Sequence, residues 1–190
     1  MNVPRGLKGD LKPAALKVAG LLSELGVSHV VSLPDNQSAP VLDAVQARDS
    51  IRLLFGTREG EVIAMASGLW LGGGSPAVLI QNTGLLESGD ALRGTASRMG
   101  VPLLLLVTCR GFAKSRALGK APSEVEMSRD TLVRPDLDSV AYMTESTLKA
   151  WGIPFVVLRD SQDLSPIEEG WARAQREARP VAVLLDTSFS

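Results

Sequence analysis

The chain has 190 residues, of which 45% are hydrophobic, and a formal net charge of −1. This length and composition suit one domain with a core of its own, since single domains commonly run to about 100–200 residues. Without an excess of basic residues, nothing in the composition favours a nucleic acid or an acidic membrane as a partner. The single cysteine, Cys109, cannot form an internal disulfide, which favours a reducing cytosol.

The distribution of apolar residues suggests neither a signal peptide nor a membrane-spanning segment. Residues 1–13 carry charge but no apolar run, so they do not resemble a signal peptide. The longest apolar run, residues 101–107, is far shorter than the roughly 20 residues that a membrane helix needs. The sequence therefore predicts a cytoplasmic protein.

Helical and strand patterns alternate along the chain. Helices are predicted over residues 11–25, 38–47, 59–71, 85–99, 139–151 and 165–178, and strands over residues 27–33, 51–55, 76–80, 101–108, 153–158 and 180–186. Ser38 is the predicted N-cap of the second helix, and Gly89 and Gly94 weaken the fourth. Residues 112–138 are rich in charge and carry two prolines, and we expect them to be irregular, as a lid or an insertion.

Short apolar strands between helices predict an α/β fold. The expected architecture is a single domain over residues 1–190, with a six-stranded, mostly parallel sheet and helices on both faces. In such sheets ligands gather at the carboxyl ends of the strands. Four polar segments follow those ends, and we expect all of them at one edge: residues 34–37, 56–59, 81–84 and 109–111.

An acid stands at the junction between the second strand and the third helix. Glu59 opens this helix, and the small residues Ala64, Ala66 and Gly68 follow it. On position alone, Glu59 and Glu61 could simply stabilise the helix dipole, by about 0.3–1 kcal/mol each. Because small residues let another backbone approach closely, a carboxylate at a subunit boundary is the alternative.

Two motifs together carry a family resemblance. They are Arg-Glu-Gly-Glu at residues 58–61 and Gln-Asn-Thr-Gly at residues 81–84. Over residues 11–158, apart from 112–138, the chain resembles the pyrimidine-binding (PYR) domain of thiamine diphosphate enzymes. It is most similar to the sulfopyruvate and phosphonopyruvate decarboxylases, above all to those with a separate alpha subunit. Either motif alone would be weak evidence for this family.

The resemblance implies a catalytic role for Glu59. In the family, the matching glutamate hydrogen-bonds N1′ of the cofactor's aminopyrimidine ring, which favours the imino tautomer that removes the C2 proton of the thiazolium. Glu59 is the match because Gly68 follows it by nine residues. Glu61 lies two residues further on and would point about 200° around the helix.

The same resemblance implies that the segment Gln81, Asn82, Thr83 and Gly84 lines the cofactor site, although these residue types also suit a plain turn. The family pattern usually continues Gly-Leu-Gly-Asn. Here Leu86 and Glu87 stand in place of the second glycine and the asparagine. This departure bears on the choice of substrate.

Four residues are candidates for contacts to the substrate: Asp35, Asn36, Arg58 and Arg110. The planar fork of arginine suits a carboxylate, sulfonate or phosphonate. Asp35 could instead form an Asx turn that caps the next helix. His29 is expected to be a packed strand residue and Cys109 a buried, inert thiol. No metal site is predicted.

The sequence lacks the Gly-Asp-Gly and asparagine motif with which the family binds magnesium and diphosphate. The resemblance therefore implies that Mg²⁺ and the diphosphate of thiamine diphosphate are held by a partner, a beta subunit of similar size. The hetero-oligomer, α2β2 or larger, would decarboxylate a small anionic 2-oxo acid. Sulfopyruvate, giving sulfoacetaldehyde and carbon dioxide, is the first candidate.

Several alternatives stay open. The substrate could be phosphonopyruvate or another 2-oxo acid. The chain could also be a non-catalytic PYR-like binding or regulatory module. A nucleotide-binding domain would need a glycine-rich phosphate loop after the first strand, and residues 34–37 do not form one.

Overall fold

Six parallel strands form the sheet at the centre of the computed structural model, which describes residues 11–119, 121–122, 125 and 127–189. The strand order is β2-β1-β3-β4-β6-β5, and every neighbouring pair is parallel. The strands are β1 (His29–Ser32), β2 (Arg52–Phe55), β3 (Pro76–Gln81), β4 (Leu104–Thr108), β5 (Phe155–Leu158) and β6 (Val181–Leu185). The predicted six-stranded α/β fold is confirmed, and the sheet is wholly rather than mostly parallel.

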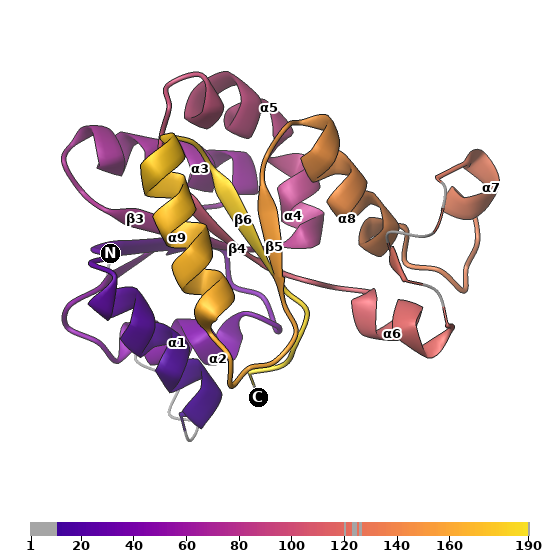
Figure 1. The fold of residues 1–190 in the computed structure, drawn as a ribbon, viewed down its shortest axis with the longest axis horizontal. Helices are drawn as coiled ribbons and strands as arrows, with labels where there is room; N and C mark the ends of the chain where they lie inside the picture. Colours follow the sequence, from indigo (N-terminus) through magenta and orange to yellow (C-terminus); the bar gives the residue numbers. More distant parts are fainter. Residues whose placement is uncertain (1–10, 120, 123–124, 126, 190) are drawn as a thin grey trace.

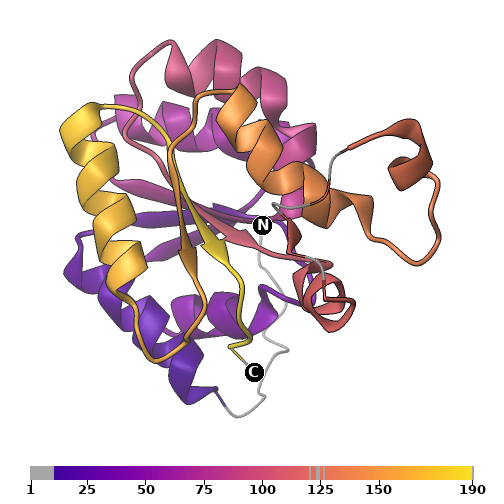
Figure 2. The ribbon, with the colours of Figure 1, turned by 45° about the vertical axis from the view of Figure 1, so that its right-hand side comes forward.

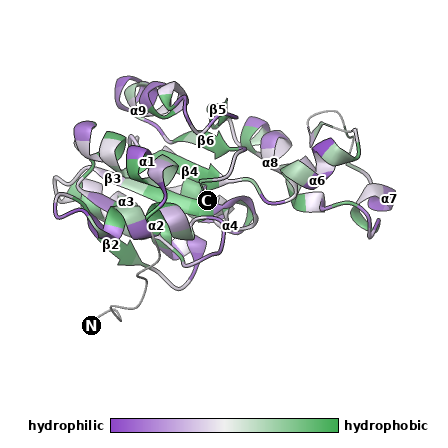
Figure 3. Cartoon of the chain, turned by 90° about the horizontal axis from the view of Figure 1, so that it is seen from below, coloured by the Kyte–Doolittle hydropathy of each residue, from purple (hydrophilic) through white to green (hydrophobic). Residues whose placement is uncertain are grey.

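Helices cover both faces of this sheet (Figures 1 and 2). One apolar core involves α1 (Pro13–Glu24), α2 (Ala39–Gln46) and α9 (Ser165–Glu177). The other involves α3 (Glu59–Leu71), α4 (Asn82–Glu87), the π-helix η1 (Leu92–Ser97) and α8 (Ser139–Ala150). Because side chains alternate along a strand, neighbouring strand residues belong to opposite cores. The strands thus form an apolar layer between two helical layers (Figure 3).

The predicted helix over residues 85–99 is broken into three pieces. α4 begins earlier, at Asn82, directly after β3, and α5 (Gly89–Ala91) and η1 follow it. A Cβ at Gly89 would lie 2.7 Å from the ring of Trp151, so this glycine permits a close approach to the end of α8. The segment 81–84, which the sequence predicts as a loop, is therefore mostly the first turn of a helix.

Residues 112–138 are only partly irregular. They include α6 (Phe112–Ala117) and α7 (Arg129–Leu132), whereas residues 120, 123–124 and 126 fall outside the described part of the chain. α6 is anchored by Phe112, which is 2% exposed and belongs to the second core. α7 projects away from the sheet (Figures 1 and 2).

Within the described residues, no helix combines the length and the apolar character needed to cross a bilayer. The prediction about a signal peptide concerns residues 1–13, of which residues 1–10 lie outside the described part of the chain.

Candidate active site

The loops after β1 and β3 leave the sheet toward opposite faces. β1 leads to α2 on one face and β3 to α4 on the other. The carboxyl edge between these two strands is therefore the switch point at which open α/β sheets bind ligands. Gln81 Nε2 donates a hydrogen bond to Gln37 Oε1 across this gap, at 3.5 Å. The four polar segments that we expected at one edge all follow carboxyl ends of the parallel strands.

Glu59, the first residue of α3, lies against Gly84 in α4. A Cβ at Gly84 would be only 2.2 Å from both Cγ and Oε1 of Glu59, so any larger residue there would displace the Glu59 side chain. Gly84 is buried and Glu59 is half-buried. Within the described residues, no hydrogen bond or ion pair engages the Glu59 carboxylate. The two motifs of the family resemblance thus meet at one point, and the acid that they place there is free to contact a ligand.

Glu61 is engaged in a different way. Its Oε2 accepts hydrogen bonds from the backbone N–H and the hydroxyl of Thr57, both at 2.7 Å. These hydrogen bonds lower the pKa of Glu61. This carboxylate closes the turn before α3, so the geometry favours Glu59 as the residue available to a cofactor.

Asn82 is fully buried, and its side chain is satisfied within the chain. Nδ2 donates to the carbonyl oxygen of Arg110 at 3.0 Å and to Thr144 Oγ1 at 3.1 Å, while Oδ1 accepts from the Arg110 N–H at 3.1 Å. The side chain therefore positions the turn after β4. Of the predicted cofactor segment, this leaves Gln81, Thr83 and Gly84 for contact with a ligand; the Thr83 hydroxyl donates to Gln81 Oε1 at 2.9 Å.

Both arginines predicted to bind the substrate already have carboxylate partners. Arg58 Nη2 lies 2.6 Å from Glu87 Oε1, and Arg110 Nε lies 3.1 Å from Asp138 Oδ2. Glu87 Oε2 also accepts from the backbone N–H of Gly60 at 2.8 Å. Each guanidinium is thus engaged by a carboxylate in this structure, and their role toward a substrate stays a prediction. Glu87, which departs from the family pattern, connects α4 to the start of α3.

The loop after β1 is built around Asp35. Its Oδ1 accepts from the backbone N–H groups of Gln37 at 2.7 Å and Ser38 at 3.3 Å, and Ser38 Oγ donates to its Oδ2. This is the Asx turn that the sequence left as an alternative. Ser38 stands at the N-cap position of α2, as predicted, but its side chain makes no capping hydrogen bond there, because the hydroxyl donates to Asp35 instead. Asn36 is exposed.

A cleft of about 490 Å³ opens at the same edge of the sheet, between the loop after β1 and the ends of β4 and β6. We call it the Arg159 cleft, and its polar lining includes Asn36, Thr108, Arg116, Arg159 and Asp186. Only Asn36 was among the predicted substrate residues. Arg159 directly follows β5, so the rule that selected the other strand ends could also have found it.

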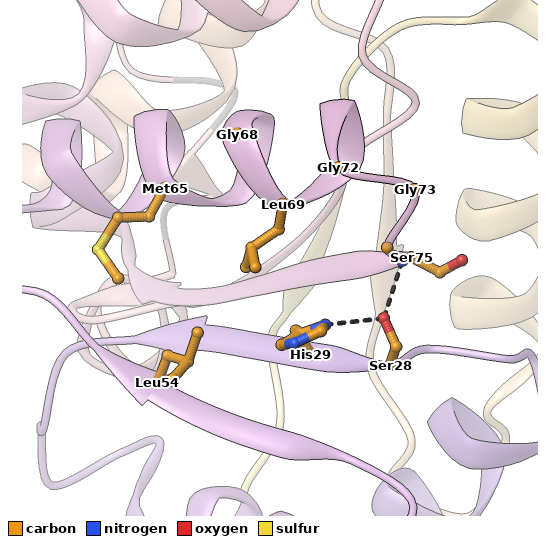
Figure 4. Close-up of a pocket in the computed structure, with 10 residues that line it drawn as sticks. Ser28, His29, Leu54, Met65, Gly68, Leu69, Gly72, Gly73 and Ser75 are labelled. Carbon is orange, nitrogen blue, oxygen red and sulfur yellow. Dashed lines mark hydrogen bonds between the residues drawn. The ribbon is translucent and has the colours of Figure 1, made fainter.

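A second hollow, of about 690 Å³, lies at the opposite, amino edge of the sheet (Figure 4). His29 lines it, and its Nδ1 is 2.8 Å from the hydroxyl of Ser28, which accepts from the Ser75 N–H. Partial burial, and secondarily the charge of Arg52, lower the pKa of His29. As predicted, His29 is a packed strand residue; it lies at the end of β1 away from Glu59.

Cys109 is 7% exposed, in agreement with the predicted buried thiol. Burial, with a smaller contribution from the Asp186 carboxylate, raises its pKa far above the usual range for a thiol. Among the described residues, no group of three or more His, Cys, Asp or Glu side chains is placed to hold a metal ion.

A parallel α/β sheet whose carboxyl edge carries a carboxylate without a partner in the described residues has the arrangement with which open-sheet domains bind ligands. The model of the family described as "Thiamine pyrophosphate enzyme, N-terminal TPP binding domain" matches residues 14–131. The chain belongs to this family, and the resemblance seen in the sequence is confirmed.

Relatives within the family are named as decarboxylases. Phosphonopyruvate decarboxylase from Streptomyces viridochromogenes is 37% identical over 98 residues, which make up 52% of this chain and 24% of that protein. The sulfopyruvate decarboxylase subunit alpha of Methanococcus maripaludis is 27% identical over 164 residues, 86% of this chain and 89% of that subunit. The chain thus spans about a quarter of the first relative but most of the second.

Solved structures share the fold. Benzoylformate decarboxylase from Polynucleobacter necessarius superposes with a TM-score of 0.63 at 19% identity, over 92% of this chain and 30% of that chain. At this identity the likeness concerns the fold, and it supports the PYR-type arrangement of the sheet and helices.

Proposed function

We propose that this chain is the pyrimidine-binding subunit of a thiamine diphosphate-dependent 2-oxo acid decarboxylase. The observation that carries the proposal is the Glu59 carboxylate, which has no partner in the described chain and lies against Gly84 at the switch point. The decarboxylase names of the relatives support the reaction class.

The residues at the switch point fit an aminopyrimidine ring. Glu59 would hold a proton against N1′ of the ring and so select its tautomer, and Gln81, Thr83 and Gly84 would contact the ring beside it. A half-buried carboxylate without a protein partner suits this task, because nothing in the described chain competes for its oxygens. When bound, thiamine diphosphate supplies the electron sink for the pair left behind as carbon dioxide departs.

Other residues of this chain keep the carboxylate in place. The hydrogen bond from the Gly60 N–H to Glu87 ties the first turn of α3 to α4, at 2.8 Å. Asn82 joins the same helix to the turn after β4. Glu59 and Gly84, one on each helix, are thereby held at a constant separation, which is what preorganised proton transfer requires.

The partner is part of the proposal. The M. maripaludis relative, of which this chain covers 89%, is named a "subunit alpha". We therefore infer a diphosphate-binding beta subunit of similar size and a hetero-oligomer, α2β2 or larger. A non-catalytic PYR-like module is the alternative if no partner restores turnover.

Sulfopyruvate is the proposed substrate and phosphonopyruvate the second candidate. The sulfopyruvate relative matches along most of both chains, whereas the phosphonopyruvate relative is more similar over a shorter stretch. Both acids carry an anionic group in addition to the 2-oxo acid carboxylate.

The test is turnover by the chain combined with its diphosphate-binding partner, thiamine diphosphate and Mg²⁺, followed as carbon dioxide release from a panel of 2-oxo acids. Glu59→Gln keeps the shape of the side chain but removes its ionisable group, so kcat should fall by about 10²–10⁴-fold while the circular dichroism spectrum and Tm stay unchanged. Glu61→Gln is the matched control and should keep kcat within a few-fold of wild type. Full activity of Glu59→Gln would contradict the assignment.

A further inference from the structure

We propose that the Arg159 cleft is an oxyanion subsite and that it takes the terminal sulfonate or phosphonate of the substrate. The second part of this statement rests on the proposed function; the first does not. The cleft, of about 490 Å³, lies within the size range of small-molecule sites, about 300–1,000 Å³.

An unsatisfied hydroxyl marks the floor of the cleft. Thr108 ends β4, lines the cleft and is only 4% exposed. Its Oγ1 is buried and finds no hydrogen-bond partner among the described residues. An isolated buried hydroxyl costs about 1–3 kcal/mol in folded proteins. This oxygen is closed to solvent, so a ligand oxygen in the cleft would accept its hydrogen bond, and relieve the cost, once the side chains around Thr108 move to uncover it.

The charges around the cleft leave one cation free. Arg116 pairs with the Asp186 carboxylate, which is 7% exposed, so these two opposite charges offset each other. Arg159 is exposed and has no carboxylate partner within the described residues. Cys109, which also lines the cleft, stays protonated because burial raises its pKa. The cleft therefore offers a guanidinium and a hydroxyl to an incoming anion.

The floor of the cleft adjoins the segment proposed to contact the cofactor. Gln81 and Thr108 are directly opposite each other in the β3–β4 register, so the cofactor segment and the cleft floor occupy neighbouring strands. Neighbouring strands lie about 4.8 Å apart. Gln37 lines the cleft and bonds Gln81, which places it between the two sites. A substrate bound beside Gln81 would therefore lie next to the cleft, and Arg159, which follows β5, lines the far side of the same cleft.

Arg159 is also the more available anion partner when it is compared with the two arginines chosen from the sequence. Arg58 and Arg110 are neutralised by Glu87 and Asp138. Arg159 follows the end of β5 and precedes α9. It lies at the same edge of the sheet, and it has no carboxylate partner within the described chain.

The first experiment measures binding of methylphosphonate to the full chain without partner or cofactor, by ³¹P NMR titration. Saturable binding is expected for wild type, with Kd raised about tenfold or more in Arg159→Met. Thr108→Val should also weaken binding while leaving Tm in the absence of ligand equal or higher, because it removes an unsatisfied buried hydroxyl. Arg98→Met, which removes another exposed arginine outside the cleft, should bind as wild type does. Absence of saturable binding, or equal Kd in all four proteins, would overturn the subsite.

The second experiment uses the complete enzyme. Arg159→Met should raise KM for sulfopyruvate about tenfold, leave kcat within about threefold, and leave KM for pyruvate, which lacks the second anion, unchanged. An unchanged sulfopyruvate KM alongside lost methylphosphonate binding would show a site for free anions and overturn the substrate part. Absence of turnover from every complex would instead count against the proposed function, while the binding experiment still decides the subsite.

Discussion

Glu59 and Glu61 lie in the same helical turn, but different residues contact their carboxylates. Glu61 is bound by Thr57, which precedes it on the same turn. Glu59 is bound by nothing in the described chain and lies on a glycine from another helix. A carboxylate held by local hydrogen bonds stabilises its turn, whereas one held only by shape keeps its oxygens for a ligand.

This argument predicts a large effect from one methyl group. In Gly84→Ala the new Cβ would collide with Glu59 Cγ, Cδ and Oε1, at 2.2–2.4 Å, so the carboxylate must move. A displacement of about 1 Å can cost 10²-fold in turnover, and we expect kcat of the complete enzyme to fall by about that factor. Gly94→Ala is the matched control, because its Cβ would meet Asp90 Oδ1 at an ordinary 3.7 Å. Equal kcat in the two variants would contradict the role assigned to Gly84.

At the scale of elements, α4 connects the parts of the site. Its first residue, Asn82, binds the turn after β4 and the Thr144 hydroxyl in α8. Its third residue, Gly84, lies under Glu59, and its last, Glu87, bonds the Gly60 N–H at the start of α3. This one short helix thereby sets the distance between α3, β4 and α8.

Asn82→Ala should therefore destabilise the fold. It removes the partner of the Arg110 N–H and carbonyl, which are partly buried, at up to about 1–3 kcal/mol for each group left unsatisfied. We expect the free energy of unfolding of the chain to fall by about 2–4 kcal/mol in a urea titration. Thr83→Ala, which removes one exposed hydrogen bond, should cost less than about 1 kcal/mol. A loss in Asn82→Ala no larger than in Thr83→Ala would show that α4 is held by other contacts.

The elements that follow from local pattern could be predicted, and those that depend on distant partners could not. Short, nearly continuous apolar runs predicted all six strands, and the polar segments after them predicted the edge, because strands buried on both faces need apolar residues at successive positions. The early start of α4 depends on Asn82 contacting Arg110 and Thr144, 28 and 62 residues away. The pairing of Arg58 with Glu87 spans 29 residues. Sequence alone showed the charges but not which of them neutralise one another.

At the scale of the whole molecule, the small residues of α3 lie in two environments, the apolar core and the exposed surface. Ala66 is fully buried in the second core, so the prediction that it lines an interface is wrong. Ala64 and Gly68, four residues apart on one side of the helix, are exposed, and Leu71 on the same side is 64% exposed. Gly68 also borders the hollow at the amino edge of the sheet (Figure 4). If the chain is one subunit of the proposed enzyme, this side of α3 is the surface that a second subunit would cover.

A bulky residue at Gly68 tests that surface without disturbing the subunit. A Cβ there meets nothing within 4 Å, and any residue other than proline improves the helix propensity over glycine, so Gly68→Phe should fold with an unchanged or higher Tm. Against a closely packed partner helix, the ring would cost about 1–3 kcal/mol, and assembly measured by light scattering after gel filtration should weaken by about tenfold or more. Ala172→Phe places the same ring on exposed α9, on the opposite face of the sheet, and should assemble normally. α9 and α3 pack on different cores, so the two variants test opposite faces of the sheet. Normal assembly of both variants would show that the subunit contact lies elsewhere. An equal loss of assembly in both would indicate a general effect of an exposed phenylalanine.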